Sequence, residues 1–308
     1  MDDSPLAGRV ALVAGATRGA GRALAVELAR AGAFVYATGR SSRTSGASEI
    51  ARPETIEGTL ERISAAGGTG IALRVDHTQP DEVSALVERI RADHGRLDVL
   101  VNDIFGGDRY AQFGTPLWTH DLAGGLRMMR MGVETHVITS ALALPLMLES
   151  GGGLLVEMTD GPREVNTVYR AGVGFFYDYV KGCVDRLITS LTAELADEPV
   201  TVVGVTPGWL RSEAMLEAFE VTEETWTQAA DRVPGFGASE TPAYVARGVV
   251  ALAADASVAR HHGAVLTARQ LSDEYGVTDV DGSRPDCWGV IRDLGWEDQP
   301  LGLLDEYR

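Results

Sequence analysis

Short apolar segments rich in β-branched residues alternate with longer segments of helical periodicity along most of the chain. The apolar segments lie near residues 9–14, 34–38, 70–75, 97–101, 153–158, 200–205 and 263–268. The helical segments lie near residues 20–31, 54–66, 80–93, 121–149, 177–196 and 240–254. Strands that are apolar on both faces and alternate with helices are typical of a parallel sheet covered on both sides. The pattern therefore predicts an α/β fold with a doubly wound, seven-stranded parallel sheet and helices on both faces.

The helix expected from residue 177 has the clearest apolar stripe. Six residues recur at helical spacing and fall on one face: Val180, Val184, Leu187, Ile188, Leu191 and Leu195. Residues 41–52 read as a polar, serine-rich loop, residues 209–239 as a mixed helical insert, and residues after about 270 as an acidic extension. No internal repeat or linker interrupts the pattern, so we expect one domain over residues 1–308.

The composition favours a globular protein that binds small molecules. The chain has 308 residues, of which 45% are apolar and 23% charged, which is enough for a large core. Lys and Arg total 27 against 44 acidic residues, so the formal charge is −17 and nucleic-acid binding is not expected. No metal site is expected either.

The cysteines and the first residues predict a cytoplasmic setting. Only Cys183 and Cys287 occur, and the start MDDSPLAGRV has two acids where a signal peptide needs basic residues. The apolar stretches RVALVAG and VITSALALPLML read as too short or too interrupted to cross a membrane, which takes about 20 apolar residues.

The first expected strand runs directly into the segment AGATRGAGRALA, which combines a glycine-rich turn with the start of a helix. Gly15, Gly19 and Gly21 let the backbone turn tightly and approach a pyrophosphate closely. The N-terminus of the following helix then stabilises the charge of the pyrophosphate. The strand before the glycines and the helix after them favour a nucleotide site over a structural turn.

The spacing Gly-x-x-x-Gly-x-Gly resembles that of the short-chain dehydrogenase/reductase family, and further motifs follow in the family's order. Asp76 in RVDHT looks like the acid that contacts adenine after the third strand, and Asn102 in LVNDIFGG looks like the first Asn of the NNAG motif. Tyr177 and Lys181 in YDYVK match the Tyr-x-x-x-Lys pair. The stretch TPGWLRS, residues 206–212, resembles the family segment that touches the nicotinamide end of the cofactor.

The resemblance covers about residues 8–268 and implies a Rossmann-type fold that binds a nicotinamide dinucleotide. The nucleotide-contacting residues that it implies are Gly15, Thr17, Arg18, Gly19, Ala20, Gly21, Arg40, Asp76, His77, Asn102, Lys181, Pro207, Gly208 and Ser212. It also implies a small-molecule substrate.

The end of the second strand, ATGRSS, predicts which dinucleotide binds. Members that use NAD carry an acid there for the ribose 2′-hydroxyl, whereas members that use NADP carry arginines near the 2′-phosphate. Here Gly39 occupies the place of the acid, Arg40 follows it, and Arg18 lies just before Gly19. Two guanidinium groups can bind a dianionic phosphate, so NADP(H) is the predicted cofactor.

Tyr177 and Lys181 are four residues apart on a helix and therefore lie on one face. A phenol has a pKa near 10, and an adjacent ammonium together with the positive nicotinamide ring is expected to lower that pKa. Tyr177 can then act as an acid or a base at neutral pH, with Lys181 orienting the ribose.

The fifth strand ends in MTDG, and this departs from the family, whose members usually place a serine hydroxyl where Asp160 stands. An ionised carboxylate there only accepts hydrogen bonds and repels a developing alkoxide. Three explanations stay open: Thr159 supplies the hydroxyl, Asp160 is protonated by burial, or the substrate carries a cationic nitrogen. Arg163 or Arg170 in the following loop can also neutralise Asp160 in an ion pair.

Two other positions depart from the family's pattern. Gly132 stands where the family has an Asn that kinks the fourth helix and binds a water linked to the Lys. Glycine can still kink the helix. His136, one turn later, can join a proton relay, although a lone His on a helix more often packs or lies on the surface. Phe105 replaces a small residue near the cofactor.

The motifs together predict an NADPH-dependent reductase that transfers hydride to a C=O or C=N bond, with Tyr177 as the proton donor. The alternative is a non-catalytic NADP-binding protein that serves sensing or assembly. The apolar residues of segment 209–239 suggest either a substrate lid or a helix core: Met215, Leu216, Phe219, Trp226 and Phe236. The fourth and fifth helices are apolar enough to suggest a homodimer or homotetramer.

Overall fold

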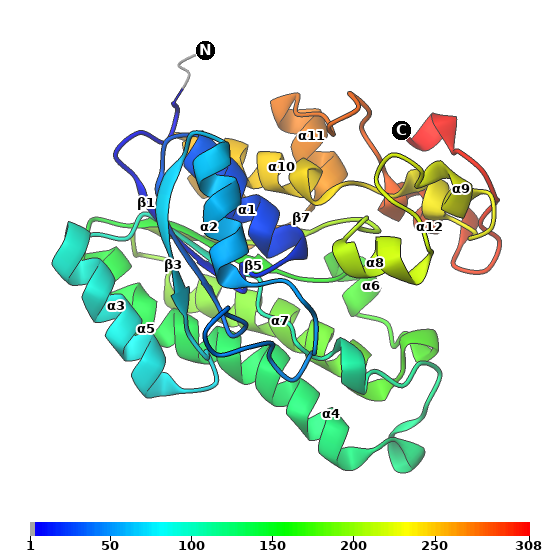
Figure 1. The fold of residues 1–308 in the computed structure, drawn as a ribbon, viewed down its shortest axis with the longest axis horizontal. Coiled ribbons are helices and arrows are strands. Elements are labelled where there is room, and N and C mark those ends of the chain that lie inside the picture. The colour runs from blue at the N-terminus through cyan, green and yellow to red at the C-terminus, as the bar shows by residue number, and fades with distance from the viewer. Residues whose placement is uncertain (1–3) are drawn as a thin grey trace.

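The computed structural model describes residues 4–308, and its centre is one twisted sheet of seven parallel strands (Figure 1). The strand order across the sheet is β3-β2-β1-β4-β5-β6-β7. The strands are β1 (Val10–Ala14), β2 (Phe34–Gly39), β3 (Thr69–Arg74), β4 (Val99–Asn102), β5 (Gly153–Met158), β6 (Val200–Thr206) and β7 (Val265–Thr267). The predicted doubly wound α/β fold is confirmed.

Helices cover both faces of the sheet (Figure 1). One face carries α1 (Gly19–Arg30), α2 (Ile56–Ala65), α10 (Pro242–Ala254) and α11 (Ala268–Tyr275). The other face carries α3 (Pro80–His94), α5 (Thr135–Glu149) and α7 (Phe175–Glu194). The shorter elements are α6 (Arg163–Asn166), α8 (Glu213–Ala218), α9 (Thr227–Ala230), α12 (Cys287–Leu294) and the 3₁₀ turns η1 (Asp108–Tyr110), η2 (Leu117–Thr119), η4 (Ala171–Val173), η5 (Phe236–Ala238), η6 (Val258–His261) and η7 (Asp305–Tyr307).

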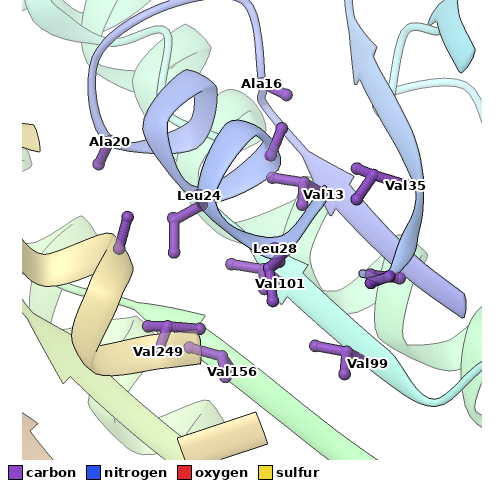
Figure 2. Close-up of a cluster of buried hydrophobic side chains, with 14 of the residues drawn as sticks. Val13, Ala16, Ala20, Leu24, Leu28, Val35, Val99, Val101, Val156 and Val249 are labelled. Carbon is purple, nitrogen blue, oxygen red and sulfur yellow. The ribbon is translucent and has the colours of Figure 1, made fainter. Parts of the chain in front are cut away.

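Each helical layer encloses an apolar core against the sheet. Figure 2 shows Leu24 and Leu28 of α1 next to strand residues such as Val13 and Val101, with Val249 of α10 in the same cluster. All five side chains are fully buried. Burying one such side chain contributes about 1.5–3 kcal/mol, so this core holds the end of β1 and the start of α1 in fixed positions.

The chain from Leu122 to Glu149 is one long helical stretch with an irregular centre. It begins as α4 (Leu122–Met129), passes through the π-helical turn η3 (Arg130–Glu134) and continues as α5. The expected break at Gly132 is therefore present as a π-helical turn. By length and composition alone, these 28 residues are long and apolar enough to cross a membrane. This corrects the expectation that the apolar stretch within them is too short or too interrupted. Half of the most apolar window is buried, and α5 packs on β4 and β5 as a core helix does.

The segment 209–239 has a small core of its own. Trp226 and Phe236 are buried, and Leu216 and Phe219 pack against them. The Met215 sulfur accepts a hydrogen bond from the Trp209 indole at 3.4 Å. The apolar residues of this segment therefore pack on one another as a helix core, and its role as a substrate lid stays a prediction.

The extension after residue 270 folds back onto the same chain beside α8 and α9 (Figure 1). It is more regular than its sequence suggests, because Thr267 and Gln270 form a capping box that starts α11 directly after β7. This early helix start shortens the last strand to Val265–Thr267, against the expected 263–268.

Candidate active site

The glycine-rich turn follows β1 at the carboxyl edge of the sheet. Gly15 has a φ of +93°, and a side chain there would place its Cβ 2.2 Å from the Asp103 carbonyl oxygen. A Cβ on Gly21 would lie 2.4 Å from the Gly15 carbonyl oxygen. Both positions therefore require glycine, and the N-terminus of α1 is left open to a close approach by an anion.

A cavity of about 230 Å³ opens beside this turn. Among the residues predicted to contact the nucleotide, those that line it are Gly15, Thr17, Arg18, Gly19, Ala20, Arg40, Asp76, His77 and Ser212. The other predicted site residues do not line this cavity: Gly21, Asn102, Thr159, Asp160, Tyr177, Lys181, Pro207 and Gly208. The glycines allow a pyrophosphate to come close to the backbone, and the helix N-terminus stabilises its negative charge. The lining therefore fits a dinucleotide.

An acid in place of Gly39 at the end of β2 would require the Thr17 side chain to move. A Cβ on Gly39 would lie 2.0 Å from the Thr17 hydroxyl oxygen. Arg40 and Arg18 both line the cavity, and each faces a carboxylate that the sequence did not indicate. Arg40 lies 3.6 Å from Glu49, and Arg18 lies 3.9 Å from Glu54.

Asp76 and His77 are neighbours in the cavity lining, but their hydrogen-bond partners differ. The Asp76 carboxylate accepts hydrogen bonds from the backbone and hydroxyl of Thr78 at 3.0 and 2.7 Å. Burial would raise the pKa of Asp76, but these hydrogen bonds outweigh it and the pKa is lowered. His77 is buried between the hydroxyls of Thr38 and Thr139 at 2.8 and 2.7 Å, and burial lowers its pKa to about 3. His77 is therefore neutral and contributes shape rather than charge to the cavity.

Asn102 belongs to a buried polar network beneath the cavity. Its amide nitrogen donates to Ser140 and to Glu157, both at 2.9 Å. The Glu157 carboxylate on β5 also bonds His136 Nδ1 at 2.5 Å, and His136 Nε2 donates to the Ile104 carbonyl at 2.9 Å. His136 is thus bonded at both ring nitrogens inside the protein, which differs from the surface or packing role common for a lone helical His.

The pKa of His136 is raised although the ring is buried. Burial alone would lower it, but the charge and hydrogen bond of Glu157 outweigh burial. Glu157 therefore favours the protonated form of His136. The pair ties α5 and β5 to residue 104, next to Phe105 in the loop that follows β4.

Tyr177 and Lys181 lie one turn apart on α7, with Phe105 between them and the cavity. The Phe105 ring lines the cavity and meets the Tyr177 ring edge-on, with centroids 5.6 Å apart. The Lys181 ammonium lies 3.9 Å from the Phe105 ring centroid and 5.6 Å from the Tyr177 ring centroid. Within residues 4–308 Lys181 forms no ion pair, so its ammonium is held by cation–π contact alone.

The residues of the chain raise the pKa of Tyr177 well above 10, which is opposite to the expectation from Lys181. Burial is the largest cause, followed by the negative charges of Asp160 and Asp108, while the positive charge of Arg170 acts in the other direction. Lys181 is not among the main causes of this shift, and its ammonium lies over the Phe105 ring. Without a bound cation the phenol therefore keeps its proton at neutral pH.

Asp160 forms an ion pair with the following loop. Arg170 Nη1 lies 3.3 Å from the Asp160 carboxylate, while Arg170 Nε donates to Asp178 at 2.9 Å. The other candidate, Arg163, pairs with Asp185 instead. Thr159 is buried, its backbone N–H donates to the Val205 carbonyl, and its hydroxyl has no partner within the described residues.

The C-terminal extension closes the side of the site formed by Pro207 and Gly208. The Trp288 indole donates to the Pro207 carbonyl at 2.8 Å, and its ring lies against Gly161. Cys287 and the buried Glu240 approach so closely that a Cβ on Gly208 would lie 2.7 and 2.8 Å from them. The extension therefore forms a wall of its own chain's site.

The helix α8 contacts the anion-binding turn directly. The Glu213 carboxylate accepts a hydrogen bond from the Gly19 backbone N–H at 2.9 Å and pairs with Arg22 at 2.9 Å. This N–H is the first of α1, where a pyrophosphate is expected to bind. Ser212 caps α8, so the residue predicted to touch the cofactor also positions Glu213.

Comparison with known proteins decides the family. The family model described as short chain dehydrogenase matches residues 9–223. This chain belongs to the short chain dehydrogenase family. It is 31% identical over 308 residues to mouse dehydrogenase/reductase SDR family member 1, covering 95% of this chain and 92% of the relative. It is 25% identical over 214 residues to the 7alpha-hydroxysteroid dehydrogenase of Escherichia coli K12, covering 70% of this chain and 76% of the relative.

Solved structures of the family share the fold. A 7 alpha-hydroxysteroid dehydrogenase in complex with NADH and 7-oxo glycochenodeoxycholic acid superimposes with a TM-score of 0.69 at 22% identity, covering 92% of this chain and 98% of that chain. A metagenomic short-chain oxidoreductase in complex with NADP gives a TM-score of 0.64 at 24% identity, covering 86% and 97%. The chain is therefore a short-chain oxidoreductase of a family that binds NAD(H) or NADP(H).

Besides the carboxylates that face Arg40 and Arg18, sequence reasoning missed Asp108, Glu157, Glu213 and Trp288. Glu157 carried a local signal, because a charged residue inside an apolar strand needs a buried partner. The other three had none. Glu213 lies 194 residues from Gly19, and Trp288 lies 81 residues from Pro207, so only the fold brings them together.

Proposed function

We propose that this protein is an NADPH-dependent reductase of a carbonyl, or of an imine, on a medium-sized small molecule. The observation that carries the proposal is the position of Tyr177 and Lys181 on α7, beside the cavity that follows β1. The raised pKa of Tyr177 supports the role of proton donor, because a donor must keep its proton until the reaction.

The choice of NADPH rests on charge and space at the end of β2. Arg18 and Arg40 line the cavity, and Gly39 stands beside the Thr17 hydroxyl where members that use NAD carry an acid. The 2′-phosphate would take the arginines from Glu54 and Glu49, whose carboxylates hold them near the cavity. Phosphate is the stronger partner because it offers two charges and three acceptors.

Each residue of the site then has a role. Gly15, Gly19 and the start of α1 hold the pyrophosphate, and Lys181 turns from Phe105 to the nicotinamide ribose. NADPH supplies the hydride when bound. Tyr177 gives its proton to the substrate oxygen as negative charge develops there, which avoids a free alkoxide.

The experiment is NADPH oxidation with a panel of ketones, quinones and imines that includes ring ketones, since hydroxysteroid dehydrogenases are among the relatives. Wild type is expected to turn over a member of the panel, and Tyr177→Phe is expected to lose at least about 100-fold in kcat. Tight NADPH binding with no turnover across the panel would replace this proposal with a non-catalytic NADP-binding role.

Cofactor preference is measured on the same proteins by fluorescence titration. Wild type is expected to bind NADPH more tightly than NADH. Removing both guanidinium groups in Arg18→Gln/Arg40→Gln is expected to weaken NADPH binding by at least about 100-fold, because each charged hydrogen bond contributes about 1.5–3 kcal/mol. NADH binding changes little in the same variant. Equal affinity of wild type for both nucleotides contradicts the choice of NADPH.

We also propose that the protein is a cytoplasmic homo-oligomer. Leu122, Leu126 and Val137 on the α4–α5 stretch and Tyr179 on α7 are large apolar side chains that are exposed in the single chain. Such exposure on neighbouring helices favours a subunit interface. The two cysteines are free thiols, which agrees with a reducing compartment. Light scattering during size-exclusion chromatography tests the assembly.

A further inference from the structure

Arg170 connects the two elements that carry the reactive groups. Its Nη1 reaches Asp160, which follows β5, at 3.3 Å, and its Nε reaches Asp178 on α7 at 2.9 Å. The Arg170 backbone N–H also donates to Asp178, at 3.3 Å. Two contacts, one from each carboxylate, hold the guanidinium in one orientation, since its fork is planar and rigid.

One nitrogen of this guanidinium remains unused. The Arg170 side chain is 7% exposed, and within residues 4–308 its Nη2 has no hydrogen-bond partner. A buried N–H without a partner costs free energy, so such a group points to a ligand that completes it. A carbonyl or alkoxide oxygen of such a ligand can accept a hydrogen bond from the Nη2 N–H.

The unused nitrogen belongs to the reactive centre. Asp178, which holds Nε, directly follows Tyr177 in the chain, and Asp160 stands where the family has its serine. Arg170 and Tyr177 also act on each other electrostatically: the positive charge of Arg170 lowers the pKa of Tyr177, and the charge of Tyr177 raises the pKa of Arg170. The guanidinium and the phenol therefore lie close enough to interact, and both lie close to Asp160.

We propose that Arg170, held by Asp160 and Asp178, donates a hydrogen bond from Nη2 to the substrate oxygen and replaces the serine hydroxyl of other family members. The proposal rests on the reductase function above. It also explains the carboxylate at position 160, which positions the guanidinium instead of contacting the substrate.

The reaction balances with Arg170 unchanged. The carbonyl carbon accepts the hydride that NADPH supplies, and the π electrons of the C=O bond move to the oxygen. Tyr177 transfers its phenolic proton to that oxygen, so the ketone becomes an alcohol and NADPH becomes NADP⁺. Arg170 keeps all its protons and stabilises the negative charge on the oxygen between these events.

The test compares steady-state kinetics of wild type, Arg170→Gln and Arg163→Gln. Arg163 is the matched control, because it lies in the same loop and pairs with Asp185 away from the site. Arg170→Gln is expected to lose about 100- to 1,000-fold in kcat, as the loss of one oxyanion donor does, while the Kd for NADPH is unchanged. Arg163→Gln is expected to keep its kcat.

Two further arms separate a donor from a structural ion pair. Added guanidinium ion is expected to restore part of the kcat of Arg170→Ala, because it can bind between the same carboxylates. Asp160→Ser in the Arg170→Gln background is expected to raise kcat, because it removes an unpaired carboxylate and returns the hydroxyl of the family. With a structural ion pair, loss and recovery of kcat follow the fraction of folded protein, which urea titration measures, whereas a donor changes the kcat of the folded protein.

The outcomes distinguish this proposal from the reductase function. Wild-type activity that survives in a folded Arg170→Gln variant, or a loss matched by Arg163→Gln, overturns the role of Arg170 and leaves the function standing. Thr159→Val tests the competing donor, since the Thr159 hydroxyl is also buried without a partner. A 100-fold loss in Thr159→Val with full activity in Arg170→Gln assigns the donor to Thr159. Full activity in Tyr177→Phe rejects the reductase mechanism itself.

Discussion

Two buried histidines, His136 on α5 and His77 in contact with Thr139 of α5, have pKa values shifted in opposite directions, and the difference comes from their partners. His77 contacts Thr139 and Thr38, which are neutral, so burial lowers its pKa to about 3. His136 contacts the Glu157 carboxylate, and its pKa is raised. Burial is shared by both rings, so the neighbouring carboxylate decides which one is charged.

His77 is expected to make the protein sensitive to acid. Its pKa is about 6.5 in the unfolded chain and about 3 in the folded chain, so the unfolded chain binds more protons between these values. The free energy of unfolding therefore falls as pH decreases below 6.5, by up to about 1.4 kcal/mol per pH unit from this group. His77→Asn is expected to reduce that slope in urea titrations between pH 7 and about pH 5.

His136→Asn provides the control with the opposite sign. The raised pKa of His136 makes its contribution to stability fully present below pH 6.5 and lost as pH rises through the folded pKa. The difference in stability between wild type and this variant is therefore expected to shrink with rising pH. The same pH slope in wild type and His77→Asn contradicts the neutral assignment of His77.

At the scale of elements, the packing of the π-helical turn η3 explains why Gly132 stands where other family members have an asparagine. A Cβ on Gly132 would lie 2.6 Å from Val180 Cγ1 and 3.1 Å from Phe105. Val180 is fully buried on α7, and Phe105 holds Lys181, so neither side chain can move freely. The helix approaches α7 closely enough that only glycine fits, and the backbone irregularity is kept without the amide.

Gly132→Asn is therefore expected to lower the free energy of unfolding by about 1–3 kcal/mol, as overpacking of a core does. Adding Val180→Ala is expected to restore part of this loss, because it removes the nearest atom. Gly182→Ala is the matched control on α7, where the nearest atom to an added Cβ is 4.0 Å away. That variant is expected to gain about 0.5–1 kcal/mol. A stabilised Gly132→Asn variant contradicts the close packing described here.

At the scale of the whole molecule, the extension after residue 270 is part of the site. Trp288 is 9% exposed and bonds the Pro207 carbonyl, while its neighbour Trp296 is 53% exposed. The mouse relative matches 95% of this chain, so the shared region includes much of this extension. The wall contacts Pro207 and lies against Gly161, so we expect it to face the substrate.

Trp288→Ala is expected to raise the KM for the carbonyl substrate by about 10-fold or more without changing the Kd for NADPH, because removal of a buried Trp costs about 3–5 kcal/mol of local packing. Trp296→Phe is the control, since Trp296 contacts Trp288 edge-on and lies at the surface. Unchanged kinetics in Trp288→Ala, with a stable fold, removes the extension from the substrate site.

Sequence reasoning predicted what local spacing determines and missed what the fold assembles. The strands, the glycine-rich turn and the Tyr177–Lys181 pair depend on residues close in the chain, so their patterns are readable. The pKa of Tyr177 depends on Asp108, Asp160 and Arg170, whose distances only the fold sets. The same holds for Asn102, whose amide turns to Glu157 on a neighbouring strand.

The contact between Glu213 and the first N–H of α1 ties two ligands together. A phosphate that takes the Gly19 N–H must displace the Glu213 carboxylate, and α8 then loses a tether to the nucleotide side of the protein. The affinity for a second ligand that contacts α8 then depends on whether the dinucleotide is bound. Each ligand must change the dissociation constant of the other by the same factor, so the total binding free energy is equal whichever ligand is titrated first.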